Sequence, residues 1–259
     1  MTDFQSLLQP CQFLLQETPQ AEECRNYLNS RLSYEMQKLF AFGYFPSIEF
    51  LTLLSSLVGE EILKKLGLLY GWRIYDSSST RNANFNFFER HPLIMPYRDI
   101  YGNVIALIGR TLLSEKDRKN LGIEKYRNTS FLKGNHLFGL FEAKSYILSE
   151  GFVYVVEGQF DVIKAFEKGI YNIVAVGNST LTSYQFSLLA RYTNKIVLLF
   201  DNDDAGEQGR KSVAKRLDTI EHGVKINYNQ YLPKGYKDLD EYLRHHDSIS
   251  LLDKTNVSV

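Results

Sequence analysis

Carboxylate side chains follow two apolar segments of this chain, at the point where each segment ends. Glu157 comes directly after Val153–Val156, and Asp201 and Asp203 follow Ile196–Phe200. Both segments have the composition of buried strands, and the glycine after the glutamate permits a tight exit into a helix. In an open α/β sheet, ligands bind where the strands end. The spacing therefore predicts three carboxylates at one edge of one sheet.

Three carboxylates at one edge repel each other unless a cation neutralises them, and hard divalent cations held by oxygen ligands suit that purpose. An EF-hand loop starting at Asp201 is excluded. Such a loop needs an oxygen ligand at its fifth position and a glutamate at its twelfth, where this chain has Ala205 and Ser212. A single polar turn after a strand is usually only a turn, but two acid clusters in one βαβ run favour a site.

The alternation of strands and helices becomes regular from residue 153. Strands are predicted at 153–156, 172–176, 196–200 and 224–230, with helices at about 160–168, 182–191 and 205–220. This order predicts a doubly wound, mainly parallel α/β sheet over residues 151–245.

Two further parts are predicted before this sheet, and a tail after it. Apolar residues at helical spacing predict an N-terminal helical part over residues 1–90, within which the polar segment Ser77–Asn86 is predicted to be a loop. Leu93–Arg98 and Val104–Gly109 are predicted to form a hairpin in an α+β subdomain over residues 91–150. Residues 246–259 are expected to form a C-terminal tail.

The segment Arg110–Lys133 is strongly basic, with seven Lys or Arg residues against three acids. Formal net charge of the whole chain is zero, so any surface that attracts nucleic acid must be local. A charge run of this kind is usually a solvated surface. Its position directly before the acidic sheet also suits binding to phosphates, with Tyr126 or Phe131 available to stack on bases.

Composition limits the other possibilities. The chain has no signal peptide pattern and no apolar run long enough to span a bilayer, so a cytoplasmic protein without a membrane partner is expected. Cys11 and Cys24 lack the spacing of metal ligands and fit a reducing compartment, so no zinc site is expected.

Two motifs resemble the signatures of a known fold. Glu157–Asp161 and Asp201–Gly206 are similar to the two acidic signatures of the Toprim fold, which DnaG-type primases, topoisomerases and some nucleases share. Upstream, Lys133–Ala143 resembles the segment that precedes Toprim in bacterial and phage DnaG-type primases. The resemblance extends from the region of Glu22 onward. It implies a Toprim domain preceded by a basic α+β subdomain with an N-terminal helical layer.

The resemblance implies a nucleotidyltransferase of DNA replication, which makes short RNA primers on single-stranded DNA from ribonucleoside triphosphates. Its implied catalytic residues are Glu157, Asp201 and Asp203, and these three would hold metal together with Asp238 and Asp240. The expected cofactor is a pair of Mg²⁺ or Mn²⁺ ions. Glu157 is either a ligand or a general base, and its position does not decide between these roles. Asp161 is expected to support the site.

The same resemblance gives Arg110, Lys125, Asn128 and Lys133 as nucleotide- or DNA-binding positions. Gly177 and Asn178 follow the predicted strand 172–176, where the glycine would let the backbone approach a ligand and the asparagine could bind phosphate or metal-bound water. A helix N-cap by Ser179 or Thr182 is compatible with this use.

Other functions could use the same acids. A Toprim nuclease would activate water to cut a phosphodiester, but nucleases of this fold are not expected to carry the basic segment or Lys133–Ala143. A topoisomerase would need a tyrosine nucleophile on a separate domain, for which this chain has no room. A non-catalytic nucleic-acid-binding module is the third alternative, and the presence of all the acids argues against it.

The chain departs from full-length bacterial primases in two respects. The Cys and His ligands of an N-terminal zinc ribbon are absent, and the sequence ends soon after the Toprim unit without a helicase-binding domain. We therefore expect either a minimal primase from a phage or mobile element, or a core that depends on a separate helicase or zinc-module protein.

Overall fold

The computed structural model describes residues 3–76, 79–217, 225–227, 230–249 and 252–253. The chain forms two compact units, each built from two stretches of sequence. The first unit comprises Met1–Tyr97 and Asn103–Phe131, and the second comprises Arg98–Gly102 and Leu132–Val259. Within the described ranges, no helix is long and apolar enough to cross a membrane. The predicted boundaries at residues 90, 150 and 245 stay a prediction.

Helices form the N-terminal part of the first unit, as predicted. They are α1 (Asp3–Glu17), α2 (Glu22–Asn29), α3 (Tyr34–Leu39), α4 (Leu51–Val58) and α5 (Glu60–Lys65), with the 3-10 turns η1 (Pro19–Ala21) and η2 (Ile48–Phe50). Leu7, Cys11 and Leu14 lie on one face of α1 and are buried, because their spacing matches the helical period. The hydroxyl of Ser33 accepts the Met36 N–H and starts α3.

A four-stranded sheet completes the core of the first unit. Its order is β1 (Gly43–Tyr44), β4 (Leu93–Arg98), β5 (Val104–Arg110) and β6 (Tyr126–Asn128), with α6 (Glu115–Leu121) between the last two in sequence. The predicted hairpin strands are therefore present as β4 and β5. The short strand β1, which pairs antiparallel with β4, was not predicted because two residues carry no strand pattern.

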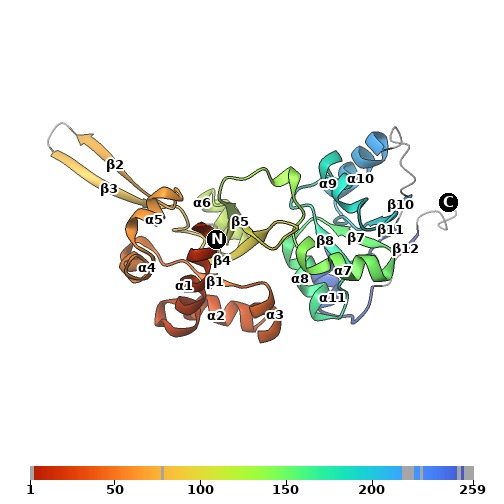
Figure 1. Ribbon diagram of the computed structural model, residues 1–259, viewed down its shortest axis with the longest axis horizontal. Coiled ribbons are helices and arrows are strands. Elements are labelled where there is room, and N and C mark those ends of the chain that lie inside the picture. The colour runs from red at the N-terminus through yellow and green to blue at the C-terminus, as the bar shows by residue number, and fades with distance from the viewer. Residues whose placement is uncertain (1–2, 77–78, 218–224, 228–229, 250–251, 254–259) are drawn as a thin grey trace. The chain divides into compact units, whose positions relative to one another are not determined.

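The prediction of a loop at Ser77–Asn86 is wrong for residues 79–86. These residues form β3 (Ser79–Asn86), which pairs antiparallel with β2 (Leu69–Asp76) over its whole length in a hairpin that extends away from the rest of the unit (Figure 1). Ser and Asn have low strand propensity, but β2 is rich in aromatic and branched residues, and pairing with it outweighs that local preference. Residues 77–78 lie outside the described part of the chain.

The second unit contains the predicted parallel sheet. Its elements are η3 (Lys133–Asn135), α7 (Leu140–Glu150), β7 (Val153–Val156), α8 (Gln159–Glu167), β8 (Ile173–Ala175), α9 (Ser183–Leu189), β9 (Lys195–Leu198), α10 (Asp204–Leu217), β10 (Lys225–Asn227), β11 (Gln230–Tyr231), α11 (Leu239–Leu243) and β12 (Leu252–Asp253). The strand order is β10-β9-β7-β8, and each neighbouring pair is parallel. Figure 1 shows α9 and α10 on one side of this sheet and α7, α8 and α11 on the other. The doubly wound α/β fold is confirmed.

Strand order in this sheet reverses beside β7. The chain passes from β7 to β8 on one side and then returns to β9 on the other side of β7. Such a reversal is where open α/β sheets bind ligands, because the connections that leave the two central strands separate there. The segments that follow β7 and β9 are those that carry the predicted acids.

Most of the predicted tail from residue 246 lies outside the described residues.

Candidate active site

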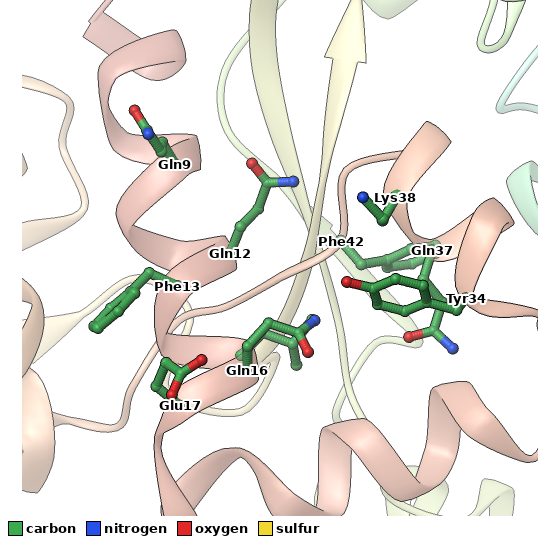
Figure 2. A pocket seen from close by; sticks show the side chains of 10 residues that line it. Gln9, Gln12, Phe13, Gln16, Glu17, Tyr34, Gln37, Lys38 and Phe42 are labelled. Carbon is green, nitrogen blue, oxygen red and sulfur yellow. The ribbon is translucent and has the colours of Figure 1, made fainter.

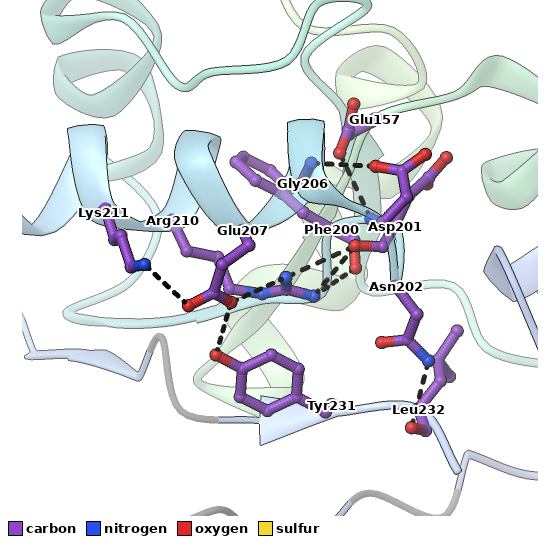
Figure 3. Close-up of polar contacts among 11 residues, drawn as sticks. Glu157, Phe200, Asp201, Asn202, Gly206, Glu207, Arg210, Lys211, Tyr231 and Leu232 are labelled. Atoms are coloured by element: carbon purple, nitrogen blue, oxygen red, sulfur yellow. Dashed lines mark hydrogen bonds and ion pairs between the residues drawn. The ribbon is translucent and has the colours of Figure 1, made fainter. Parts of the chain in front are cut away.

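Glu157 follows β7 and is half-buried. Its Oε1 accepts the main-chain N–H of Asp201 at 3.2 Å, so the ends of β7 and β9 are joined through this carboxylate (Figure 3). Burial, with the nearby carboxylates of Asp201 and Asp203, raises the pKa of Glu157 to about 7. The structure thus brings the three predicted acids together, and we call Glu157, Asp201 and Asp203 the acid edge.

Asp201 and Asp203 lie in the turn between β9 and α10. Asp203 Oδ1 accepts the Gly206 N–H at 3.0 Å, and its Oδ2 lies 3.7 Å from Lys237 Nζ. A Cβ atom on Gly206 would lie only 2.2 Å from the carbonyl oxygen of Asp201. The first turn of α10 can therefore press against this backbone only because residue 206 is glycine.

The other predicted acids gather around Asp161, which is buried in the first turn of α8. One oxygen of Asp161 accepts the Gly158 N–H at 3.1 Å, and the other accepts the Asp240 N–H at 2.8 Å. Burial and the carboxylates of Asp238 and Asp201 raise the pKa of Asp161 well above its ordinary value. This carboxyl group links the exit from β7 to the start of α11, and its supporting role in the site stays a prediction.

Asp238 and Asp240 already have partners within α11. Asp238 is the N-cap, and its Oδ1 accepts the Glu241 N–H at 2.8 Å. Asp240 is buried and pairs with Arg244. These contacts use one oxygen of each carboxylate, Asp238 Oδ1 and Asp240 Oδ2. The assignment of both residues as metal ligands stays a prediction.

Lys133 and Gly177 meet in the second unit. Lys133 Nζ donates to the carbonyl oxygen of Gly177 at 3.2 Å, and the Gly177 N–H donates to the carbonyl oxygen of Glu157 at 3.0 Å. Gly177 has φ +69°, and Asn178 beside it is exposed. Three predicted positions thus adjoin the end of β7, and their binding role stays a prediction.

Gln185 was not predicted to have a role, although it holds the Lys133 segment in place. Its side chain is fully buried and donates to the carbonyl oxygens of His136 at 2.7 Å and Val176 at 3.1 Å. Thr182 Oγ1 adds a 2.6 Å bond to the carbonyl oxygen of Gly134. The spacing of Thr182 and Gln185 indicates a capping box, but a sequence gives no signal of the distant carbonyls that these side chains also bind.

We expect Gly177→Ala to destabilise the protein by about 1–2 kcal/mol more than an ordinary surface change, because its φ lies in the left-handed region. The added Cβ would also lie 3.2 Å from Lys133 Cδ. Gly169→Ala is a matched control, since Gly169 has φ +78° and no atom within 4 Å of an added Cβ. Chemical denaturation measures the unfolding free energy of both variants. Equal losses of unfolding free energy would show that the close approach of the added Cβ to Lys133 costs nothing.

Arg110, Lys125 and Asn128 belong to the first unit. Arg110 Nη1 donates to the Tyr126 hydroxyl at 2.6 Å, and its guanidinium lies 4.9 Å from the ring centroid of Tyr27 and 5.1 Å from that of Tyr126. Lys125 is exposed and lies over the Tyr126 ring at 5.5 Å, and Asn128 is on β6. Cations that alternate with aromatic rings form a surface suited to phosphates and stacked bases.

A separate pocket of about 300 Å³ lies in the first unit, between α1 and α3 (Figure 2). Glutamine and aromatic side chains line it, including Gln9, Gln12, Phe13 and Tyr34. None of the predicted site residues is part of this lining.

The acid edge has the oxygen-only donor set that Mg²⁺ and Mn²⁺ prefer. Burial is the main cause of the raised pKa of Glu157, and repulsion by Asp201 and Asp203 adds to it; a cation would relieve that repulsion. As the side chains stand, no group of three or more His, Cys, Asp or Glu residues in the described ranges is arranged to hold a metal ion. The three residues fit a divalent cation by the chemistry of their donor atoms, but ligation would require their carboxylates to turn toward it.

Comparisons with known proteins identify both units. A family model described as the DNA primase catalytic core, N-terminal domain, matches residues 12–144, and a Toprim-like model matches residues 154–243. The DNA primase of Aquifex aeolicus is 35% identical over 237 residues, which cover 90% of this chain and 45% of that protein. The chain spans less than half the length of the curated relatives that we compared.

Solved primase structures share this fold. The crystal structure of the zinc-binding and RNA polymerase domains of the Aquifex aeolicus primase is 32% identical, with a TM-score of 0.71 over 95% of this chain and 59% of that one. A DnaG primase catalytic domain bound to single-stranded DNA is 27% identical, with a TM-score of 0.68 over 93% of this chain and 75% of that one. Because the primase core model alone covers just over half of the sequence, the chain belongs to the family of DnaG-type DNA primase catalytic cores.

Proposed function

We propose that this chain is a primase that synthesises short RNA primers on a single-stranded DNA template from ribonucleoside triphosphates. The observation that carries the proposal is the acid edge. Its three carboxylates meet where the strand order of a parallel sheet reverses, in a chain of the DnaG-type family. The relatives named as DNA primases support the same activity.

Divalent cations would bind at the acid edge through Glu157, Asp201 and Asp203, and a second ion would be held with the help of Asp238 or Asp240. When bound, Mg²⁺ or Mn²⁺ lowers the pKa of the attacking 3′-hydroxyl and neutralises charge on the leaving pyrophosphate. Glu157 is either a ligand or the general base. Asp161 keeps the backbone on either side of the site in place through its two hydrogen bonds.

The template and the incoming nucleotide would use the basic positions. Arg110 and Lys125, together with the rings of Tyr27 and Tyr126, offer charge for the phosphates and faces for the bases of single-stranded DNA. The similar DnaG catalytic domain that is bound to single-stranded DNA supports this assignment. In the second unit, Lys133 and Asn178, beside Gly177, are suited to triphosphate oxygens, since one is a cation and the other an exposed amide.

Partner proteins would complete the role in replication. The Aquifex aeolicus structure includes a zinc-binding domain. We propose that a zinc module and a helicase assist this chain in primer synthesis in the cytoplasm. Adding such proteins should then raise primer yield.

The test is primer synthesis by the wild-type chain and by Asp201→Ala, on single-stranded DNA with ribonucleotides and Mg²⁺ or Mn²⁺. We expect RNA products from the wild type and at least a thousandfold loss in the variant, because several kcal/mol of charge stabilisation depend on this carboxylate. Asp204→Ala removes an exposed neighbouring acid and should keep activity. Primers that survive Asp201→Ala would refute the proposal, and cleavage of the DNA without primers would favour a nuclease.

A further inference from the structure

Arg210 is a buried cation directly behind the acid edge. It lies on α10 and is only 3% exposed, although a buried charge is costly unless it is paired. Its guanidinium donates to the carbonyl oxygen of Phe200 and, at 3.3 and 3.4 Å, to the carbonyl oxygen of Asp201 (Figure 3). Phe200 and Asp201, which carry these carbonyls, lie between the end of β9 at Leu198 and the start of α10 at Asp204.

Two other side chains fix the position of Arg210. Its guanidinium stacks over the ring of Tyr231, 4.3 Å from the centroid, and its Nη1 lies 3.7 Å from Glu207 Oε2. The Tyr231 hydroxyl donates to that same glutamate oxygen at 2.9 Å. The planar guanidinium is therefore held on its face and its edge, which leaves one orientation for the bonds to the two carbonyls.

The main chain of Asp201 is consequently held from both sides. Its N–H donates to Glu157 and its C=O accepts from Arg210. The next peptide is held as well, because the Asn202 N–H donates to the carbonyl oxygen of Lys237 at 2.8 Å. The peptide that carries the Asp201 carboxylate thus has little freedom to rotate.

We propose that Arg210 is a positioning residue of the metal site, which sets the direction of the Asp201 carboxylate by holding the carbonyls of Phe200 and Asp201. The inference rests on the proposed use of the acid edge to bind divalent cations. Partners that orient metal ligands typically change metal affinity tenfold to a hundredfold when they are removed. Lysine could keep the charge of Arg210 but not the planar fork that reaches two carbonyls at once.

This role differs from that of a simple counter-charge. If Arg210 served only to offset the negative charge of the acid edge, its removal would strengthen the attraction for a cation. If Arg210 orients the carboxylate, its removal weakens cation binding, and lysine does not restore it. The sign of the change and the behaviour of the lysine variant therefore separate the two roles.

The experiment measures the Kd for Mn²⁺ alone, by electron paramagnetic resonance of the free ion, on the full chain and on Arg210→Met and Arg210→Lys. We expect both variants to bind Mn²⁺ at least about tenfold more weakly than the wild type. The control is Arg216→Met, on the same helix, because Arg216 also donates to a main-chain carbonyl, that of Leu181 at 2.9 Å. It should lower the melting temperature without changing the Kd.

Wild-type affinity in Arg210→Lys, or tighter binding in Arg210→Met, would overturn the inference. If Arg210→Met does not fold, the lysine variant decides alone. Primer synthesis is measured separately: a wild type that binds Mn²⁺ without making primers contradicts the proposed function but leaves the positioning role to be judged by the variants. A wild type that binds no Mn²⁺ overturns both.

Discussion

Glu157→Gln is expected to abolish primer synthesis and to stabilise the metal-free protein at pH 8. The first effect follows because glutamine can neither carry negative charge for a cation nor accept a proton. We expect a loss of at least about a thousandfold, equivalent to several kcal/mol in the transition state. The Asp201 N–H should keep its bond, since glutamine retains an acceptor oxygen at the same place.

The second effect follows from the pKa of Glu157, which rises from an ordinary value of 4.5 to about 7 in the fold. An acid whose pKa is raised by folding stabilises the protein below its unfolded pKa, and this contribution is lost as the pH rises through the folded value. The full shift corresponds to about 3 kcal/mol. Glu157 is half exposed, so screening by solvent reduces the expected gain in Glu157→Gln to about 1 kcal/mol at pH 8.

Urea denaturation of the metal-free protein at pH 5 and pH 8 measures this gain. The difference in unfolding free energy between variant and wild type should be small at pH 5 and in favour of the variant at pH 8. Glu150→Gln removes an exposed glutamate at the end of α7 and should change neither stability nor synthesis. A variant that is less stable than the wild type at pH 8 would show that the ionised Glu157 carboxylate does not destabilise the folded protein.

Gly206→Ala is expected to reduce primer synthesis at least about a hundredfold while the two units stay folded. The new Cβ would lie 2.2 Å from the carbonyl oxygen of Asp201 and 3.0 Å from its carbonyl carbon, so the acidic turn must move. Displacement of a catalytic group by about 1 Å can lower the rate by that factor. The clash should also lower the unfolding free energy by about 1–3 kcal/mol.

The measurement compares initial rates of synthesis, and the Kd for Mn²⁺, in Gly206→Ala and Gln208→Ala. Gln208 is exposed on the same helix, so its replacement tests the general effect of an added alanine and should be neutral. Near-wild-type activity in Gly206→Ala would show that the helix can shift without moving the acid edge.

Much of the second unit could be predicted from the sequence because its signals are local. Four apolar segments with helical segments between them predict a parallel sheet, and acids that directly follow two of these segments must lie at the same sheet edge. The proximity of Glu157 to Asp201 follows from that topology. In the first unit, Ser114 and Gly122 cap α6 at its N- and C-terminal ends, although no helix was predicted there.

Arg210 and Gln185 could not be found in this way, because their partners are main-chain carbonyls. Every residue has a carbonyl, so no sequence pattern identifies the ones that a buried side chain will reach. The same limit explains the error at β3, whose Ser and Asn residues predict a loop until β2 is known to lie alongside. The exact contacts that support the acid edge therefore depend on tertiary packing.

The turn Arg98–Gly102 affects how the two units can be separated. It is part of the second unit, although the segments on both sides of it belong to the first. Arg98 pairs with the buried Glu142 at 2.7 Å, and Lys144 donates to the carbonyl oxygen of Ile100 at 2.8 Å. A fragment that starts at residue 132 would leave the Glu142 carboxylate buried without its guanidinium, which is strongly destabilising. Truncation at a single position therefore cannot yield both units intact. Separating the units requires circular permutation of the chain, or grafting of the turn Arg98–Gly102 onto the second unit.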